Sequence, residues 1–436
     1  MRVRNALTAR SIGRRSLLKA GLGSALLLPA AARWGSARAQ DQVGITLTTS
    51  FASPDERDAY EELVAQFEAL FPNIDVDYQP VPSDYDTKLQ ADLAAGNAAD
   101  VFTVTDILAP DLTSRGVLQP IDDLMAASGV PTTDFYPGLI ANFQYNGQTF
   151  GIPKDFSTLA MVYDPIAFEA AGVAAAPTTW DELRAAGQAL VDGGQAPIVV
   201  GPQFDRYLAF HYAAGATVIS DDGSAIEVNS EQAAQALEFF YGLYRDGIAQ
   251  SPADVGASWA GDAFAKDFAS IVFEGPWMFG ALESAAPDKE FQVAEMPAGP
   301  AGKSTLAFTV AYCLYANTFQ EDPAKGQAAW ELVNFLTGTD GMTAWTRAAI
   351  LMPSRPALAD QFLEDFPQFE AFLASGEFAH GFAMGPGGLR FNSDANGEIE
   401  ALFAEQQDVA TTLENLQARA EETITLTPSD TGTPTS

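Results

Sequence analysis

An early part of the sequence alternates between strand and helix patterns, and this order constrains the fold most. Residues 45–48 and 74–78 alternate apolar and polar side chains, as strands with one buried face do, and 101–104 form a third short strand. Between them, 54–71 and 85–93 carry apolar side chains at helical spacing. This strand–helix–strand–helix–strand order predicts a parallel sheet with helices packed on it.

The same alternation returns later, which indicates a second α/β unit. We expect helices at 180–191, 231–244, 324–336 and 399–420 and strands at 197–200 and 271–273. A length of 436 residues fits two such lobes. Ligands of parallel sheets bind beyond the carboxyl ends of the strands, so two facing lobes predict a cleft for a small molecule.

The charge and the rare residues narrow the possible partners. The chain has 57 acidic residues against 23 Lys plus Arg, a formal charge of −34. Such a surface repels nucleic acid and anionic lipid, so we expect neither as a partner. The only cysteine, Cys313, precludes an intramolecular disulfide, and two histidines, His211 and His380, preclude a His-rich metal site. We therefore expect no metal and no cofactor.

The two ends of the chain differ from the rest. Residues 1–39 contain eight basic residues and no acidic ones, with Arg14-Arg15 ahead of a short apolar run at 20–32 and small residues before a cleavage site after Ala39. This pattern predicts a signal peptide of the twin-arginine type. We expect a periplasmic or extracellular protein that is not a lipoprotein and has no membrane insertion of the mature chain. Residues 427–436 predict a disordered tail.

The sequence lacks the motifs of common hydrolases. It has no Gly-x-Ser-x-Gly elbow and no His-Glu-x-x-His pair. Residues 302–304 read Gly-Lys-Ser, but a strand-like run at 306–314 follows where a phosphate-binding loop needs a helix. A glycoside hydrolase, which needs only two suitably spaced carboxylates, stays open as an alternative.

Several polar and aromatic residues follow predicted strands, where the cleft is expected. A sugar ring stacks its apolar face on an aromatic side chain, while its hydroxyls need carboxylate, amide or guanidinium partners. The candidates for a sugar site are Asp106, Asp155, Ser157, Trp259, Glu274, Trp277 and Arg355. Trp259 and Trp277 could instead belong to the core. Asp106 could cap a helix, and Arg355 could form a surface ion pair.

An ordered set of motifs resembles one protein family. The matching segments are 67–76, 95–102, 147–153, 162–164, 177–183, 274–277 and 352–355. Among them, Gly-Gln-Thr-Phe-Gly-Ile-Pro resembles a hinge-crossing strand, and Glu-Gly-Pro-Trp resembles a strand end that supplies a sugar-stacking Trp. The chain thus resembles the extracellular solute-binding proteins of ABC importers, in the carbohydrate-binding group that includes maltose-binding protein.

The resemblance implies an α/β, two-lobed periplasmic-binding-protein fold of type II, with the ligand cleft at the hinge. Residues 41–153 and 308–352 would form lobe 1, and residues 154–307 and 353–426 would form lobe 2. The positions that match the family's cleft are Ser50, Phe51, Asp106, Asp155, Ser157, Tyr207, Trp277 and Tyr312. We expect a monomeric, non-catalytic receptor that closes over a carbohydrate and docks transiently on the importer's transmembrane subunits.

Two departures from the family leave the solute open. Thr103 stands where maltose binders carry an aromatic residue, and 307–312 differ from the family's Gly-rich polar run. A polyol or a glycerol-phosphate-like solute is the alternative to a sugar. Its phosphate would need positive charge, for which Lys154, Arg206 and Arg355 are available.

Overall fold

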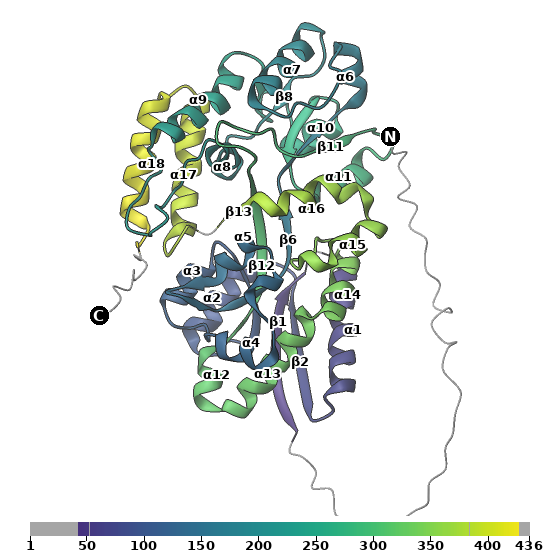
Figure 1. Ribbon diagram of the computed structural model, residues 1–436, viewed down its shortest axis with the longest axis vertical. Helices are drawn as coiled ribbons and strands as arrows, with labels where there is room; N and C mark the ends of the chain where they lie inside the picture. The colour runs from purple at the N-terminus through teal and green to yellow at the C-terminus, as the bar shows by residue number, and fades with distance from the viewer. Residues whose placement is uncertain (1–41, 52, 383, 427–436) are drawn as a thin grey trace, which may run out of the picture.

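The chain folds into two lobes that lie one above the other along the long axis of the molecule (Figure 1). The computed structural model describes residues 42–51, 53–382 and 384–426. The predicted signal at 1–39 and the predicted tail at 427–436 lie outside these residues. Each lobe contains a β-sheet flanked by helices, which confirms the predicted two-lobed α/β class.

The strands form two large sheets and one small hairpin. In chain order they are β1 (Val43–Ser50), β2 (Ile74–Val81), β3 (Val101–Thr105), β4 (Gln144–Tyr145), β5 (Gln148–Thr149), β6 (Gly151–Thr158), β7 (Ala160–Tyr163), β8 (Ile198–Val199), β9 (Ala249–Gln250), β10 (Ile271–Glu274), β11 (Gln292–Ala294), β12 (Thr305–Leu314) and β13 (Ala379–Gly381).

The helices surround these sheets. They are α1 (Pro54–Leu70), α2 (Tyr85–Ala95), α3 (Ala109–Ser114), α4 (Asp122–Ser128), α5 (Pro137–Ile140), α6 (Pro165–Ala171), α7 (Trp180–Asp192), α8 (Phe204–Ala213), α9 (Glu231–Arg245), α10 (Ala260–Ala265), α11 (Trp277–Ala285), α12 (Ala316–Glu321), α13 (Pro323–Thr337), α14 (Thr339–Ala349), α15 (Ala359–Asp365), α16 (Glu370–Ala374), α17 (Gly388–Phe403) and α18 (Val409–Thr423). Short 3-10 turns occur at Thr132–Asp134, Ala141–Phe143, Pro356–Leu358, Pro367–Phe369 and Ser375–Phe378. None of these described helices is both long and apolar enough to span a membrane.

Lobe 1 contains the predicted parallel unit. Its sheet has the order β13-β12-β3-β1-β2, in which β1 pairs in parallel with both β2 and β3. Helix α1 begins where predicted, because the Ser53 hydroxyl accepts the Glu56 N–H at 3.2 Å and Pro54 occupies the first turn. Helix α2 ends at Gly96, whose φ of 74° suits a residue without a Cβ.

Lobe 2 is a mixed sheet with a large helical layer. The strand order is β11-β7-β10-β8-β9, with β10 parallel to β8 and antiparallel to β7. Helices α8, α9, α17 and α18 contribute to one apolar core beside this sheet. The single helix predicted at 399–420 is wrong, because the chain reverses after α17. Glu405 adopts a left-handed φ of 56°, and Asp408 then caps α18 by accepting the Thr411 N–H.

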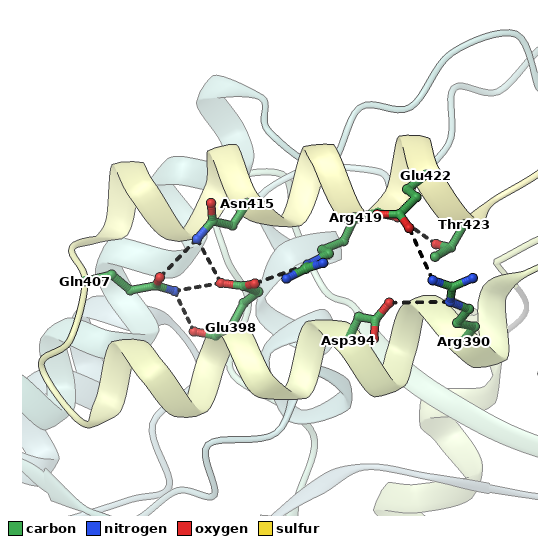
Figure 2. A network of polar contacts seen from close by, with 8 residues as sticks. All are labelled: Arg390, Asp394, Glu398, Gln407, Asn415, Arg419, Glu422 and Thr423. Atoms are coloured by element: carbon green, nitrogen blue, oxygen red, sulfur yellow. Dashed lines mark hydrogen bonds and ion pairs between the residues drawn. The ribbon is translucent and has the colours of Figure 1, made fainter.

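The reversal after α17 creates an antiparallel helical hairpin. Its facing polar side chains form the network in Figure 2, in which Glu398 accepts hydrogen bonds from Gln407 and Asn415 and lies 3.4 Å from the Arg419 guanidinium. At the other end of the hairpin, Arg390 pairs with Glu422 at 3.2 Å. These contacts join α17 to α18, and the apolar side chains of both helices belong to the core of lobe 2.

Two long antiparallel strands, β6 and β12, connect the lobes (Figure 1). β12 pairs with β3 of lobe 1 through 310–314 and with β13 through 305–307. The register of β6 against β12 shifts between Val310 and Ala311, which leaves Lys154 as an extra residue in β6. The chain also continues from α14, in the core of lobe 1, to α15 and α16, which pack with α10 and α11.

A buried carboxylate ties the first lobe together. Asp100 is almost inaccessible to solvent. Its oxygens accept hydrogen bonds from the backbone and the hydroxyl of Thr46 at 2.8 Å each and from the Thr318 hydroxyl at 2.8 Å. The Lys325 ammonium lies 2.9 Å away. Asp100 therefore joins β1, the entry to β3, α12 and α13 around one side chain.

We expect Asp100→Ala to lower the free energy of unfolding by about 3 kcal/mol, because several buried groups lose their partner. Asp75→Ala, an exposed position on β2, serves as the matched control and should change stability by less than about 0.5 kcal/mol. Urea denaturation of both variants measures the difference. Equal stabilities of the two variants would contradict the role assigned to Asp100.

Candidate functional site

A hollow of about 320 Å³ lies at the carboxyl ends of β1 and β3 in lobe 1. We call it the lobe-1 hollow, and it is lined by Ser50, Asp84, Tyr85, Asp86, Thr87, Thr103, Thr105 and Val310. These residues lie at the carboxyl ends of the parallel strands β1 and β3, at the start of α2 and on the hinge strand β12. This is the edge at which parallel sheets bind ligands.

Two hydroxyls in the lobe-1 hollow lack hydrogen-bond partners among the described residues. They belong to Thr103, which is 1% exposed, and to Thr105. The Tyr85 hydroxyl bonds to the backbone of Thr103 and not to its side chain. It donates to the Thr103 carbonyl at 2.9 Å and accepts from the Thr103 N–H at 3.0 Å. Buried hydroxyls without partners are costly, so these two positions favour a polar ligand.

Lobe 2 presents an aromatic and charged cluster where the end of β10 meets the start of α8. We call it the lobe-2 rim, and it consists of Asp205, Arg206, Glu274 and Trp277. The Arg206 guanidinium lies 2.8 Å from Glu274 and 2.9 Å from Asp205. The indole N–H of Trp277 donates to Glu274 at 3.0 Å, and 41% of this side chain is exposed. The Arg206 guanidinium also lies over the indole ring, 5.7 Å from its centroid. A partly exposed indole with a fixed N–H suits stacking against a ligand.

The backbone before Trp277 explains its orientation. A Cβ at position 275 would lie 2.2 Å from the indole ring, so only glycine allows the ring to fold back over this segment. Desolvation raises the pKa of Glu274, while the charge of Arg206 and the bonds from Arg206 and Trp277 lower it. The buried carboxylate thus holds both neighbours in fixed positions.

The hinge strand β12 connects the two parts of the site. Phe308 contacts the Trp277 ring edge to face at a centroid distance of 5.6 Å. Val310, two residues further along the strand, lines the lobe-1 hollow. Residues two apart on a strand share one face and lie roughly 7 Å apart. The lobe-1 hollow and the lobe-2 rim therefore contact the same face of the hinge strand, and we call the region between them the cleft.

Asp106 lies beneath this cleft, between β3 and β12. Its carboxylate accepts hydrogen bonds from the Ile107 N–H at 3.0 Å and from the Thr309 N–H at 3.2 Å, and it also interacts with the Phe382 backbone. Burial nevertheless raises the pKa of Asp106 to about 7, because desolvation of the charge outweighs these bonds. Asp106 thus holds lobe 1, the hinge and the segment after β13 together.

Several predicted site residues meet at the cleft. Ser50 lines the lobe-1 hollow, while Glu274 and Trp277 form the lobe-2 rim. Ser157 pairs with Phe308 across β6 and β12, so it lies on the cleft side of the hinge. Phe51 follows Ser50 and is half-buried. These positions remain candidates for ligand contact.

Other predicted site residues have structural partners instead. Tyr207 is buried in the lobe 2 core, where its hydroxyl lies 3.0 Å from the Ala233 carbonyl. Tyr312 is buried in lobe 1 and donates to the Tyr60 hydroxyl at 3.1 Å. Trp259, half-buried at the start of α10, packs against the core shared by α10 and α11. We therefore omit these residues from the candidate site.

Two charged candidates are also engaged elsewhere. Asp155 pairs with Lys154 and accepts the Trp345 indole N–H at 2.7 Å, which anchors the hinge to α14. Arg355 pairs with Asp134 at 2.8 Å and donates to the Thr337 carbonyl at 2.8 Å. Both side chains are mostly buried by these contacts. These contacts give both side chains structural partners, and their contact with a ligand stays a prediction.

No sequence motif indicated the start of α2, Thr105 or Asp205 as site residues. Asp84, Asp86 and Thr87 line the lobe-1 hollow. Their position alone could have indicated them, because these residues follow β2 at the same edge of the sheet as Ser50. The pairing of Arg206 with Glu274 bridges 68 positions in the chain, and no local pattern indicates it.

The chemistry of these groups suits binding. Burial lowers the pKa of His211 to about 4, and this side chain lies in the lobe 2 core against Tyr207. Cys313 is fully buried, which raises the pKa of its thiol. Within the described ranges, no three His, Cys, Asp or Glu side chains form a metal-binding group. The cleft instead offers an indole face, hydroxyls and carboxylates.

This arrangement of two α/β lobes around a hinge, with polar and aromatic groups on both sides of a cleft, defines a solute-binding protein. A profile of bacterial extracellular solute-binding proteins matches residues 53–343. The chain belongs to that family, and the predicted family is confirmed. A relative in Brucella abortus, whose name describes only a binding protein, is 26% identical over 381 residues, covering 83% of this chain and 88% of its own length.

Solved structures show the same fold. The cyclic α-maltosyl-1,6-maltose binding protein of Arthrobacter globiformis superposes with a TM-score of 0.76 at 22% identity, covering 87% of this chain and 98% of that one. UgpB of Mycobacterium tuberculosis, in complex with glycerophosphocholine, superposes with a TM-score of 0.71 at 21% identity, covering 87% and 98%. The two proteins share one architecture and bind different solutes.

We expect the Asp106 carboxyl to titrate with a midpoint near pH 7, which carbon-13 NMR of the labelled side chain can measure. The folded state binds this proton more tightly than the unfolded state, whose carboxyl has a pKa near 4. The stabilisation from Asp106 is thus complete below about pH 4 and is lost as pH rises through about 7. A midpoint below about pH 5 would show that the backbone N–H bonds prevail over burial.

Proposed function

We propose that this protein is the extracytoplasmic receptor of an ABC importer and that it binds a carbohydrate between its lobes. The observation that carries the proposal is the exposed Trp277, which Glu274 orients. It faces the same cleft as the hydroxyls of Thr103 and Thr105, which have no hydrogen-bond partner among the described residues. The indole supplies a stacking surface for a sugar ring, and the cleft oxygens supply partners for its hydroxyls. The cyclic oligosaccharide receptor of Arthrobacter globiformis supports the same ligand class.

Binding in this cleft couples to lobe closure. A ligand that contacts the lobe-1 hollow and the lobe-2 rim together binds the closed arrangement better than the open one, and it shifts the population accordingly. The closed form then docks on the importer's membrane subunits and delivers its solute. Export by the twin-arginine-type signal and action as a monomer complete the proposal.

The charges disfavour the phosphorylated alternative. Arg206, the only one of the three candidate cations at the cleft, is already paired with both Asp205 and Glu274. Lys154 and Arg355 are likewise paired with carboxylates, away from the lobe-1 hollow. A phosphate group would therefore meet more negative than positive charge. A neutral or cationic solute fits this cleft better.

Isothermal titration calorimetry with mono- and oligosaccharides tests the ligand class. One carbohydrate should bind and raise the thermal unfolding temperature, since a ligand of the folded state stabilises it. Binding only of a non-carbohydrate solute would contradict the proposal. Prolonged incubation with the bound sugar, followed by product analysis, tests the glycoside hydrolase alternative, and turnover abolished by Glu274→Gln would favour it.

We expect Trp277→Ala to lower the affinity for the carbohydrate at least tenfold, about 1.4 kcal/mol, because the stacking surface is lost. Phe268→Ala is the matched control, since Phe268 is 43% exposed in the same lobe but precedes β10, at the end away from the cleft. Calorimetry compares the two variants. Equal affinities would remove Trp277 from the site.

A further inference from the structure

The lobe-1 hollow contains negative charge without a counter-ion. Asp84 and Asp86 are its only charged lining residues. Neither has a side-chain hydrogen bond or ion pair among the described residues, and Lys88, one turn along α2, pairs with Asp92 instead. The start of α2 contributes roughly half a positive charge, which two carboxylates exceed. The hollow is therefore net negative.

The opposite side of the cleft does not compensate this charge. Arg206 carries the only positive charge of the lobe-2 rim, and two carboxylates flank it at 2.8 and 2.9 Å. Asp205 retains a buried oxygen, Oδ1, without a hydrogen-bond partner among the described residues. Both sides of the cleft thus have an excess of acceptor oxygens and negative charge.

The hydroxyls in the hollow also favour a ligand that donates hydrogen bonds. Thr103 and Thr105 carry oxygens without partners, and Thr103 is almost fully buried against the hollow. A protonated amine has three N–H donors and no acceptor, so it can engage a carboxylate and two hydroxyl oxygens together. Desolvation raises the pKa of Asp86. A cation beside this carboxylate would lower the pKa again, because it stabilises the ionised form.

We propose that the lobe-1 hollow binds an ammonium group through Asp86 and the Thr103 hydroxyl, so that the carbohydrate taken by this cleft is an amino sugar. The inference rests on the proposed sugar-binding function and names its substrate class. The ammonium occupies the acidic hollow, while the ring stacks on Trp277 of the opposite lobe. The Thr103 hydroxyl and the Asp86 carboxylate, which have no side-chain partner in the described part of the chain, then both gain one.

Matched sugar pairs test this inference. Calorimetry compares glucosamine with glucose, galactosamine with galactose, mannosamine with mannose, and the β-1,4-linked glucosamine disaccharide with cellobiose. The titrations are performed at about pH 6, where amines of this kind keep their proton. In at least one pair, the amino sugar should bind at least tenfold more tightly, and the preference should decrease with added salt.

Two variants locate the preference. Asp86→Asn should reduce the amine-to-hydroxyl affinity ratio at least fivefold, whereas Asp123→Asn, which removes the same charge from the exposed start of α4 in lobe 1, should leave the ratio unchanged. Thr103→Val should also reduce the ratio. This variant should not lower the thermal unfolding temperature, because the Thr103 hydroxyl has no partner among the described residues.

The outcomes separate the two proposals. If neutral sugars bind as tightly as the amino sugars in every pair, the amino-sugar inference is overturned and the sugar receptor stands. If no sugar of either kind binds, both proposals fail. A preference for amines that is unchanged in Asp86→Asn would also overturn the inference, because it would assign the preference to the overall acidity of the protein.

Discussion

The pairing of β6 with β12 is the interaction on which the rest of the structure depends. These two strands are shared by both lobes, so the position of each cleft-lining group is fixed relative to one ladder of hydrogen bonds. Phe308 and Val310 show the effect, since one contacts the lobe-2 rim and the other lines the lobe-1 hollow. Asp106 reinforces the ladder from below, because it accepts the Thr309 N–H within β12.

Buried polar groups divide into two kinds in this protein. Asp100 and Asp155 have their oxygens occupied by neighbouring side chains, and they fix the packing around them. The hydroxyls of Thr103 and Thr105 are equally enclosed but have no such partner in the described part of the chain. These two hydroxyls support the proposed ligand site because they lie at the carboxyl edge of the strands, where parallel sheets bind ligands.

The sequence predicted the class of fold well, because periodicity reports which face of a segment is buried. It also placed Trp277 after a buried strand, although this strand extends one residue further than predicted and includes Glu274. It could not separate Tyr207 from the cleft, because an aromatic residue has the same local pattern in a core and in a site. The α17–α18 reversal was missed because Glu405 enters the left-handed region without a glycine.

The extra residue at Lys154 has a mechanical consequence. A bulge lets a strand bend without loss of the flanking ladder bonds, and this one lies between the parts of β6 that belong to different lobes. Lys154 therefore marks a bend at the joint, whereas each lobe is held together by its own apolar core. Substitutions near Lys154 can thus change the joint without changing the packing inside either core.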